Sequence, residues 1–206
     1  MDTASFALIA HDLKNALGSL ENELAVMIDD PSPVLAHSAH MRCMELRRQF
    51  VQFLTVYGSA TALQAHCEDE SPSAVLSSLY RFSQIRHLSL PNAPKVAIKV
   101  DQTEPAYWYF DSRLVQMALD AAMHNASRFA NSLVTLSLRQ DNGYLVFVID
   151  DDGPGLGALD PSDSSTGLGT ELCRSVASAH RCGERHGQVK LMNGPNGGAR
   201  FELWLP

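Results

Sequence analysis

The first 58 residues of the chain carry two apolar stripes with helical spacing, separated by a short break that contains two prolines. From about Thr3 to Ile28, apolar residues recur with a 3-4-3 spacing, which is typical of one face of a long helix. Pro31 and Pro33 end this pattern, because proline lacks a backbone donor and disfavours a helical residue before it. A second helix is expected from about Val34 to Gly58. The sequence therefore predicts two antiparallel helices.

The two apolar stripes indicate that the hairpin packs against a second hairpin. Their members are Phe6, Ile9, Leu13, Leu17, Leu20, Leu24 and Met27 in the first helix, and Ala39, Leu46, Phe50, Phe53 and Tyr57 in the second. One hairpin cannot close a core alone, whereas two hairpins from two chains form a four-helix bundle in which every stripe is buried. We therefore expect a homodimer.

The composition changes after His66, where a polar stretch from Glu68 to Ser73 contains a proline and predicts a linker. Two domains are therefore expected, residues 1–66 and residues 67–206. In the second, helices are expected at about Ala74–His87, Leu114–Phe129 and Glu171–His180, and strands at about Val96–Val100, Tyr107–Phe110, Val134–Leu138, Tyr144–Ile149, Gln188–Met192 and Ala199–Leu205.

The order of these elements indicates the fold class. The sequence Gln140-Asp-Asn-Gly143 predicts a tight turn between two neighbouring strands. Helices mixed with antiparallel strands are typical of a two-layer α/β sandwich, in which helices cover one face of a mixed sheet. We predict an α+β chain, with a dimerising antiparallel helical hairpin followed by this sandwich.

Charge and hydropathy exclude several classes of partner. The chain has 16 Lys and Arg against 23 Asp and Glu, so its formal charge is −7, and no basic run attracts nucleic acid or an anionic membrane. No apolar window approaches the ~18 to 20 residues of a membrane span, and the N-terminus lacks a basic signal region. A cytoplasmic location is expected. No C-x-x-C pair indicates zinc, and buried reduced thiols are expected for Cys43, Cys67, Cys173 and Cys182.

His11 is the first candidate for chemistry. It lies two residues from both Ile9 and Leu13, about 200° away around a helix, so it is predicted to face solvent. Asp12 can accept the proton of one imidazole nitrogen and leave the other as a nucleophile. The outer face around His11, which includes Leu8, is suited to docking a partner. An ordinary surface histidine beside a solvated aspartate is the alternative.

Two glycine-containing loops form the second candidate site. The strand that ends near Ile149 leads into Asp150-Asp-Asp-Gly-Pro-Gly155, and a second loop, Ser165-Thr-Gly-Leu-Gly-Thr170, precedes a helix. Glycines let backbone amides approach phosphates, and a helix start adds a favourable dipole for anions. A carboxylate at the strand's end can accept the amino group of adenine. The alternative is a pair of tight turns without a ligand.

The third candidate lies within the expected helix before these loops. Asn125 has a poor helix propensity and is out of place in a helix interior. With Arg128 and Phe129 one turn further on, it fits a contact with a magnesium phosphate, a guanidinium and a ring beside a nucleotide. An exposed asparagine on a wet helix face is the alternative.

Together these stretches, in this order, resemble the transmitter core of the sensor histidine kinases over almost the whole chain. Ala10-His-Asp-Leu-Lys-Asn15 is similar to the phosphoacceptor box of that family. The resemblance implies that His11 is the phosphorylation site and that Asp12 is its acid/base partner. Asn15 matches the position at which members with phosphatase activity place a polar residue that orients water.

The resemblance also implies a Bergerat-type ATP-binding sandwich that uses ATP and Mg²⁺. Asn125 is implied as the magnesium ligand, Arg128 and Phe129 as neighbours of the nucleotide, and Asp151 as the adenine reader. Gly153 and Gly155 fall in the first glycine box, and Thr166-Gly167-Leu-Gly169 resembles the second. Asn196 to Pro206 is similar to the strand that usually ends this domain.

The chain departs from the family pattern at several positions. Ala121 stands where the family usually has a second polar residue, and Asp120 is one position out of register. Nine residues, Leu156 to Ser164, separate the glycine boxes, and Ser165 replaces the usual first glycine of the second box. Arg181 to His186 reads as a small insertion.

The resemblance implies a histidine kinase that phosphorylates His11 from ATP and passes the phosphoryl group to an aspartate of a response-regulator receiver domain. A histidine phosphotransfer protein with a vestigial ATPase domain, relaying phosphoryl groups between receivers, is the alternative. A non-catalytic adaptor is a third possibility. The sequence holds no sensor or receiver segment, so the input is expected from elsewhere or from a longer chain.

Overall fold

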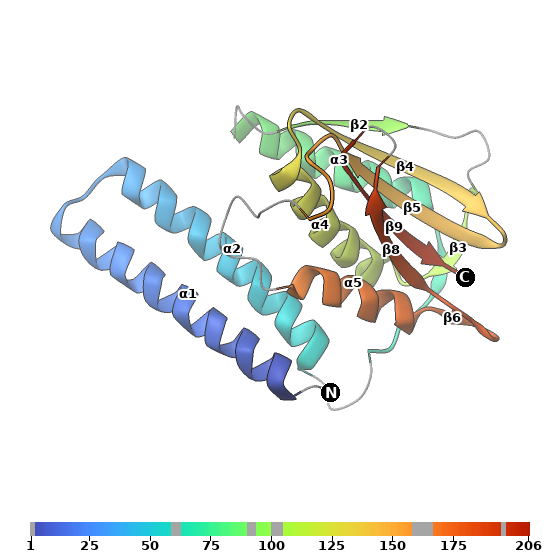
Figure 1. Ribbon diagram of the computed structural model, residues 1–206, viewed down its shortest axis with the longest axis horizontal. Coiled ribbons are helices and arrows are strands. Elements are labelled where there is room, and N and C mark those ends of the chain that lie inside the picture. Colours follow the sequence, from blue (N-terminus) through green and yellow to red (C-terminus); the bar gives the residue numbers. More distant parts are fainter. Residues whose placement is uncertain (1–2, 59–62, 90–93, 100–104, 158–166, 195–196) are drawn as a thin grey trace. The chain divides into compact units, whose positions relative to one another are not determined.

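The computed structural model describes residues 3–58, 63–89, 94–99, 105–157, 167–194 and 197–206. The chain divides into two compact units, of which the first contains the N-terminal helices and the second begins near residue 62. Helix α1, Thr3–Asp29, and helix α2, Pro33–Tyr57, lie side by side as an antiparallel pair (Figure 1). The predicted helical hairpin is therefore confirmed.

The two helices of the hairpin pack through the inner half of their apolar stripes. Ile9, Leu13 and Leu20 are buried on α1, and Ala39 and Phe53 are buried on α2. Pro33 occupies the first turn of α2, where its missing N–H costs no hydrogen bond. Between the helices, three rings form one cluster with centroids 5.1 to 5.9 Å apart, those of Phe6, Phe53 and Tyr57.

Many apolar side chains of the hairpin, some from these stripes and some from positions beside them, remain exposed in the single chain. Large apolar side chains exposed on the hairpin are Phe6, Leu8, Leu17, Leu24, Val26, Ile28, Val34, Met44, Phe50, Val51 and Leu54. Phe50, for example, exposes 52% of its surface. So many exposed apolar side chains on two paired helices favour a further packing partner for the hairpin.

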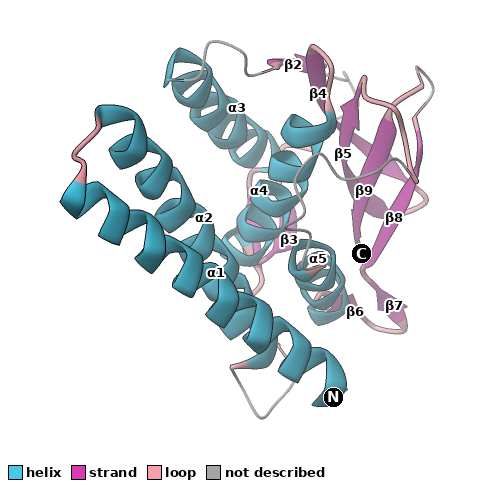
Figure 2. Cartoon of the chain, turned by 60° about the vertical axis from the view of Figure 1, so that its left-hand side comes forward, coloured by secondary structure: helices cyan, strands magenta, loops and turns pink. Residues whose placement is uncertain are grey.

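The second unit contains a mixed five-stranded sheet in the order β2-β4-β5-β9-β8. Its strands are β2 (Lys95–Lys99), β4 (Leu133–Asp141), β5 (Tyr144–Asp151), β8 (Gln188–Asn193) and β9 (Ala199–Leu205). Strand β2 is parallel to β4 and all other pairs are antiparallel. One face is covered by helices α3 (Pro72–Ser89), α4 (Ser112–Phe129) and α5 (Leu168–Ala179), as Figure 2 shows. This is the predicted two-layer sandwich.

The core of the sandwich lies between these helices and the inward-facing side chains of the central strands. Leu136, Leu138, Phe147 and Leu203 are at most 1% exposed, as expected for alternate positions on strands that face helices. The ring of Phe110 meets that of Phe147 edge-on at 6.1 Å. The predicted turn between β4 and β5 is confirmed, with left-handed φ angles of 49° at Asn142 and 76° at Gly143.

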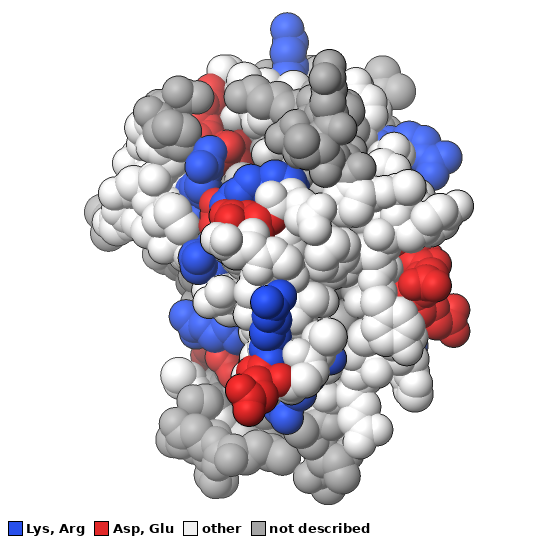
Figure 3. Space-filling view, turned by 90° about the vertical axis from the view of Figure 1, so that its right-hand side faces the viewer, with Lys and Arg blue, Asp and Glu red and all other residues white. Residues whose placement is uncertain are grey.

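The opposite face of the sheet carries charged and aromatic side chains that pack on one another. The indole of Trp204 donates to Glu202 at 2.8 Å, and Glu202 also accepts from Arg139 at 3.1 Å. The ammonium of Lys190 lies 3.6 Å from the centroid of the Trp204 ring. Figure 3, which views the side of the molecule at the right of Figure 1, shows basic side chains interleaved with acidic ones. Beside these ion pairs, Trp204 packs with the buried Val146 and Val148.

The structure corrects the predicted linker. Glu68–Glu70 forms strand β1, which pairs antiparallel with strand β3, Trp108–Phe110. Three successive acidic residues are poor strand formers, but pairing with β3 provides hydrogen-bond partners for their backbone and overrides that propensity. The six residues predicted as a small insertion form a further two-stranded hairpin, β6 (Arg181–Cys182) and β7 (Arg185–His186), with Gly183 at φ 59° in its turn.

The structure also corrects the prediction for the thiols. Cys173 is buried, and burial raises its pKa to about 12, but Cys43 and Cys182 are exposed and Cys67 is half-buried. Burial was expected because cysteine behaves as a small hydrophobic residue. Whether a cysteine is buried depends, however, on which face of its helix or strand it occupies. No helix within the described ranges is long and apolar enough to cross a membrane.

Candidate functional site

His11 lies on the outward face of α1, as its spacing predicts. Its side chain is 61% exposed, while Ile9 and Leu13, two residues before and after it, are buried. Leu8, on the same outer face, is also exposed. An accessible imidazole beside an exposed leucine can meet a reactive group carried by another domain or protein.

Two polar side chains of α1 approach the same nitrogen of His11. The Asn15 amide nitrogen, one helical turn further on, lies 3.1 Å from His11 Nδ1. The Asp12 carboxylate oxygen Oδ1 lies 3.7 Å from that nitrogen. The structure therefore brings the predicted residues His11, Asp12 and Asn15 together on one helix face.

Asp151 ends strand β5 and is buried, although it is a carboxylate. Its oxygen Oδ1 accepts two backbone hydrogen bonds, from Gly153 N at 2.9 Å and from Ala199 N at 3.1 Å. These bonds tie the start of the first glycine turn to the start of β9. A carboxylate held this way has one oxygen fixed and its orientation determined by the backbone.

Several glycines around Asp151 are required by close backbone approach. A Cβ added at Gly153 would overlap the carbonyl oxygen of Phe129, and one added at Gly198 would overlap the carbonyl oxygen of Asp151. Gly155 has a left-handed φ of 83°, and an added Cβ would lie 2.9 Å from Asn193 Oδ1. A residue with a side chain at Gly153 would push this turn away from the end of α4.

Asp150, Asp151 and Asp152 are adjacent but have different partners. Asp152 accepts hydrogen bonds from Ser132 N, Ser132 Oγ and Leu133 N at 2.6 to 3.1 Å. Burial opposes ionisation of Asp152, but these hydrogen bonds outweigh it and lower its pKa to about 2. Asp150 makes a bidentate ion pair with Arg200, with nitrogen–oxygen distances of 2.7 and 2.9 Å. Both neighbours of Asp151 are therefore occupied in holding the fold.

The last two turns of α4 carry Asn125, Arg128 and Phe129, all half-buried. The guanidinium carbon of Arg128 lies 5.0 Å from the centroid of the Phe129 ring. Since the Phe129 carbonyl approaches Gly153, the end of α4 and the first glycine turn are in contact. The structure thus brings Arg128 and Phe129 next to the turn that follows Asp151.

Ala121 lies one turn before Asn125 on α4 and is 1% exposed. A methyl group packed in the core provides neither a metal ligand nor a base at that turn. Asp120 is exposed and lies five positions before Asn125, which places the two about 140° apart around the helix. Although the residue as a whole is exposed, desolvation of its carboxyl group by neighbouring atoms raises the pKa of Asp120, against a smaller lowering by its hydrogen bond from Gln116. Asp120 does not replace the missing polar residue.

The second glycine loop is described only in part. Gly167 has a left-handed φ of 70°, and Gly169 lies in the first turn of α5. Thr166, Ser165 and most of the nine-residue segment between the boxes lie outside the described residues. In the described part of the chain, no three His, Cys, Asp or Glu side chains cluster to form a metal site.

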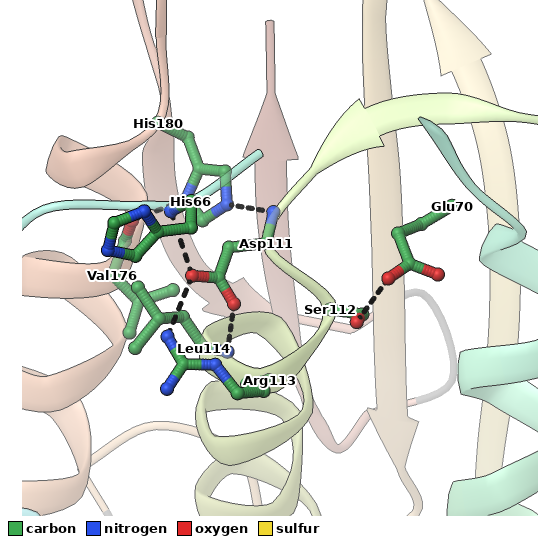
Figure 4. Close-up of polar contacts among 8 residues, drawn as sticks. All are labelled: His66, Glu70, Asp111, Ser112, Arg113, Leu114, Val176 and His180. Atoms are coloured by element: carbon green, nitrogen blue, oxygen red, sulfur yellow. Dashed lines mark hydrogen bonds and ion pairs between the residues drawn. The ribbon is translucent and has the colours of Figure 1, made fainter. Parts of the chain in front are cut away.

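A buried polar cluster fixes the start of α4, as Figure 4 shows. Asp111 caps this helix by accepting from Leu114 N at 3.1 Å. Its other oxygen accepts from the backbone N–H of His66 at 2.9 Å and from Arg113 at 3.2 Å. Burial would raise the pKa of Asp111, but the hydrogen bonds from His66, Leu114 and Arg113 lower it overall.

His180, just after α5, completes this cluster. Its Nε2 accepts from Asp111 N at 3.0 Å, so its Nδ1–H donates to Val176 O at 2.7 Å. Burial lowers the pKa of His180, and this outweighs the opposite effects of Val176 and Asp111. His180 is therefore a neutral structural histidine that joins the end of α5 to the start of α4.

Sequence reasoning missed three contributors to the nucleotide-type site. Asn193 accepts from Leu156 N at 2.8 Å and supports the first glycine turn, and Ala199 N contacts Asp151. Neither has a local sequence signal, because both act across strands that are far apart in sequence. Gly198 lies in a pair of glycines before the last strand, and that pair was the available signal.

The residues implied for phosphoryl acceptance lie in the first unit, and Asn125, Arg128, Phe129, Asp151, Gly153 and Gly155 lie in the second. Residues 110–206 match the family described as histidine kinase-, DNA gyrase B- and HSP90-like ATPases. The chain is also 25% identical to the sensor histidine kinase CpxA of Escherichia coli K12 over 161 residues, which are 67% of this chain and 34% of CpxA. The chain is thus similar to the transmitter core of sensor histidine kinases, and its second unit to their ATPase domain.

A second curated relative matches nearly the whole chain. The sensor protein RstB of Escherichia coli K12 is 27% identical over 214 residues, covering 96% of this chain and 47% of RstB. The chain thus spans about a third to a half of the length of these relatives.

Solved structures show the same fold. Histidine kinase AdeS of Acinetobacter baumannii superposes with a TM-score of 0.71 at 20% identity, covering 95% of this chain and 96% of that one. Histidine kinase ThkA, solved in complex with the response regulator TrrA, also has a TM-score of 0.71, at 16% identity, covering 97% of this chain and 60% of that one. Both superpositions cover the helical hairpin as well as the sandwich.

Proposed function

We propose that this chain acts as a two-component histidine kinase in the cytoplasm: it phosphorylates His11 from ATP and passes the phosphoryl group to an aspartate of a response-regulator receiver domain. Residues 1–66 are proposed as the dimerisation and phosphoacceptor domain, and residues 67–206 as the ATP-binding domain. The observation that carries the proposal is the exposed His11, next to Asp12, in the same chain as an ATPase-family domain.

The fixed carboxylate of Asp151 is proposed to read adenine. Both of its backbone hydrogen bonds go to Oδ1, so Oδ2 is the oxygen proposed to accept from the adenine amino group. The glycine turns at Gly153, Gly155, Gly167 and Gly169 would present backbone amides to the phosphates.

The end of α4 is proposed to hold the phosphate side of the site. Arg128 would neutralise phosphate charge, and Phe129 would lie beside the nucleotide. Asn125 is proposed as the one protein ligand of Mg²⁺, with phosphate oxygens completing the coordination, which is how this ion is commonly held at nucleotide sites. When bound, Mg²⁺ would neutralise charge that develops on the transferred phosphoryl group.

His11 is the proposed phosphoryl acceptor on the hairpin. Asp12 would take the proton that one imidazole nitrogen must lose when the other bonds to phosphorus. Asn15 is proposed to orient a water molecule when the phosphorylated histidine is hydrolysed. The exposed surface around Leu8 is the proposed docking site for the receiver domain, a class of partner present in the solved ThkA complex.

A homodimer is proposed because of the exposed apolar half of the hairpin. Phe50, Leu54 and Leu17 are among the large apolar side chains that the described part of the hairpin leaves in water. A second hairpin that packs on Phe50, Leu54 and Leu17 would bury them at roughly 25 cal/mol for each Å² removed from water, and it would leave Leu8 to the receiver domain. The resulting four-helix bundle leaves the outward His11 accessible.

The direct test is incubation of the purified chain with Mg²⁺ and ATP labelled in the γ-phosphate. We expect an acid-labile, base-stable label that is lost in His11→Gln and kept in His40→Gln, a matched change at another exposed histidine of the hairpin. Label that persists in His11→Gln would contradict the role of His11.

Calorimetric titration with ATP separates the proposed kinase from the phosphotransfer alternative. Ala121, buried where a polar residue is usual in the family, is the observation that favours the alternative. ATP binding with labelling supports the kinase. No binding at millimolar ATP, with phosphoryl transfer to His11 from a phosphorylated receiver, would establish the relay.

A further inference from the structure

Asn15 and Asp12 make opposite demands on His11. An amide N–H can only donate, so the 3.1 Å contact from Asn15 Nδ2 requires a lone pair on His11 Nδ1. The ring proton of the neutral imidazole is then on Nε2. An ionised carboxylate can only accept, so a hydrogen bond to Asp12 requires the proton on Nδ1 instead.

The distances decide which demand is met. Asn15 is within hydrogen-bond range of Nδ1, whereas the Asp12 oxygen at 3.7 Å is beyond it. One turn before His11, α1 carries Ala7 and Leu8, whose side chains have no hydrogen-bonding group. On this helix, the side chains of Asn15 and Asp12 therefore compete for Nδ1.

We infer that Asn15 is a positioning residue that holds His11 in the tautomer with its proton on Nε2, and that this contact restrains the nucleophilicity of His11. The effect of Asn15 on phosphorylation from ATP rests on the proposed function. In this tautomer, Nε2 has no lone pair to offer, and the lone pair of Nδ1 is covered by the Asn15 amide. A phosphoryl donor that approaches His11 therefore meets no ring nitrogen with an available lone pair.

Phosphorylation then requires that Asp12 replace Asn15 at Nδ1. With the proton on Nδ1, the lone pair of Nε2 attacks the γ-phosphorus of ATP and forms the nitrogen–phosphorus bond. The bond from the γ-phosphorus to its bridging oxygen breaks, and its electron pair leaves with ADP. The proton on Nδ1 passes to the Asp12 carboxylate. Asn15 thus slows loading through the same contact that places its amide beside the acceptor ring.

The tautomer can be measured without ATP. In protein labelled with ¹⁵N-histidine at pH 8.5, where imidazoles are neutral, the ring nitrogen shifts report which nitrogen holds the proton. His11→Gln identifies the resonances of His11. We expect the Nε2–H tautomer in the parent and a two- to tenfold change in the tautomer ratio towards Nδ1–H in Asn15→Ala, the range expected for loss of one hydrogen bond of about 0.5–1.5 kcal/mol.

Two further variants sharpen this measurement. Asn15→Asp replaces a donor with a group that only accepts, so its tautomer ratio must move further towards Nδ1–H than that of Asn15→Ala. Asn22→Ala, a matched change at another exposed asparagine of α1, must leave the ratio unchanged. A parent with its proton on Nδ1, or a ratio that is the same in the parent, Asn15→Ala and Asn15→Asp, would overturn the inference.

Reactivity provides the second readout. Phosphoramidate donates a phosphoryl group to imidazoles chemically, so it tests His11 even if the chain does not use ATP. We expect Asn15→Ala to raise the initial rate of His11 phosphorylation about two- to tenfold with phosphoramidate and also with ATP and Mg²⁺. An unchanged phosphoramidate rate despite a shifted tautomer would overturn the restraint. Failure with ATP alone would count against the proposed function and leave the inference standing.

Discussion

The helical hairpin and the sandwich solve the problem of burial differently. In the sandwich, side chains such as Phe147, Leu138 and Leu203 are at most 1% exposed, so this unit has a closed core of its own. In the hairpin, the best-buried apolar residues of α1 remain 7–8% exposed, and Phe50 is half exposed. A packed core gives rigid positions for backbone contacts such as those of Asp151. An open hairpin presents a histidine and an apolar surface to partners.

The largest expected effect concerns the core of the sandwich. Leu138→Ala removes a side chain that is 1% exposed, and we expect it to lower the free energy of unfolding of the sandwich by about 4 kcal/mol. Denaturant titration followed by tryptophan fluorescence reports this unit alone, because both tryptophans of the chain, Trp108 and Trp204, lie in it.

The matched change in the hairpin is Leu20→Ala, at a residue that is 7% exposed. It should lower helical circular dichroism at intermediate denaturant and shift the fluorescence transition by no more than about 0.5 kcal/mol, as expected for independent sites. If both substitutions shift the fluorescence transition equally, the two regions unfold as one unit and the comparison between them fails.

The next effect concerns the open side of the hairpin. Phe50→Glu places a charge in the proposed dimer interface, and we expect it to weaken dimerisation at least 100-fold, about 3 kcal/mol, because a buried unpaired charge is costly. Sedimentation equilibrium measures the dissociation constant. Leu191→Glu, on strand β8 of the sandwich and similarly exposed, is the control and should leave the dimer intact. A monomeric parent would remove dimerisation from the account.

The three adjacent carboxylates allow a finer test within the sandwich. Asp151→Asn retains an oxygen for Gly153 and Ala199 but puts an amide where Oδ2 stood, so we expect about 10- to 100-fold weaker ATP binding. Calorimetry measures this affinity. Asp152→Asn should destabilise the turn at Ser132 and change ATP affinity less than twofold. Equal losses in the two variants would mean that Asp151 acts only through the fold.

The smallest expected effect is the pH dependence introduced by His180. Burial lowers its pKa in the folded state, so the unfolded chain binds more protons as the pH falls. Its contribution to stability is therefore complete above the ordinary histidine pKa of about 6.5 and is lost below it, by at most about 1.4 kcal/mol per pH unit. His180→Gln keeps an acceptor for Asp111 N without titrating, so it should flatten the unfolding free energy measured from pH 7.5 to 5. The same slope in parent and variant would contradict this role.

The fold was predictable to the extent that it depends on periodicity. The apolar stripes on α1 and α2 and the turn at Asn142 and Gly143 are local patterns, and the structure confirms both. Strand β1 was read as a linker because Glu68–Glu70 has no strand propensity, and its pairing with β3 depends on residues about 40 positions away. Local sequence does not encode such a contact.

The candidate site divides in the same way. The outward direction of His11 follows from helix geometry, and Asp151 follows from a carboxylate placed before glycines. The contacts that distinguish Asp151 from Asp150 and Asp152 come from Ala199, Arg200 and Ser132, on other strands and turns. The spacing of the three carboxylates alone therefore could not separate a proposed ligand reader from two structural residues.

In the proposed reaction, ATP bound by the sandwich phosphorylates His11 on the hairpin. The most direct measurement is to map the phosphoryl group by mass spectrometry at neutral pH after incubation with ATP and Mg²⁺, in the parent and in Asp151→Asn at an ATP concentration that saturates only the parent. We expect phosphate on His11 in the parent and a large reduction in the variant. Phosphate on another residue, or none on His11 in a parent that binds ATP, would contradict it.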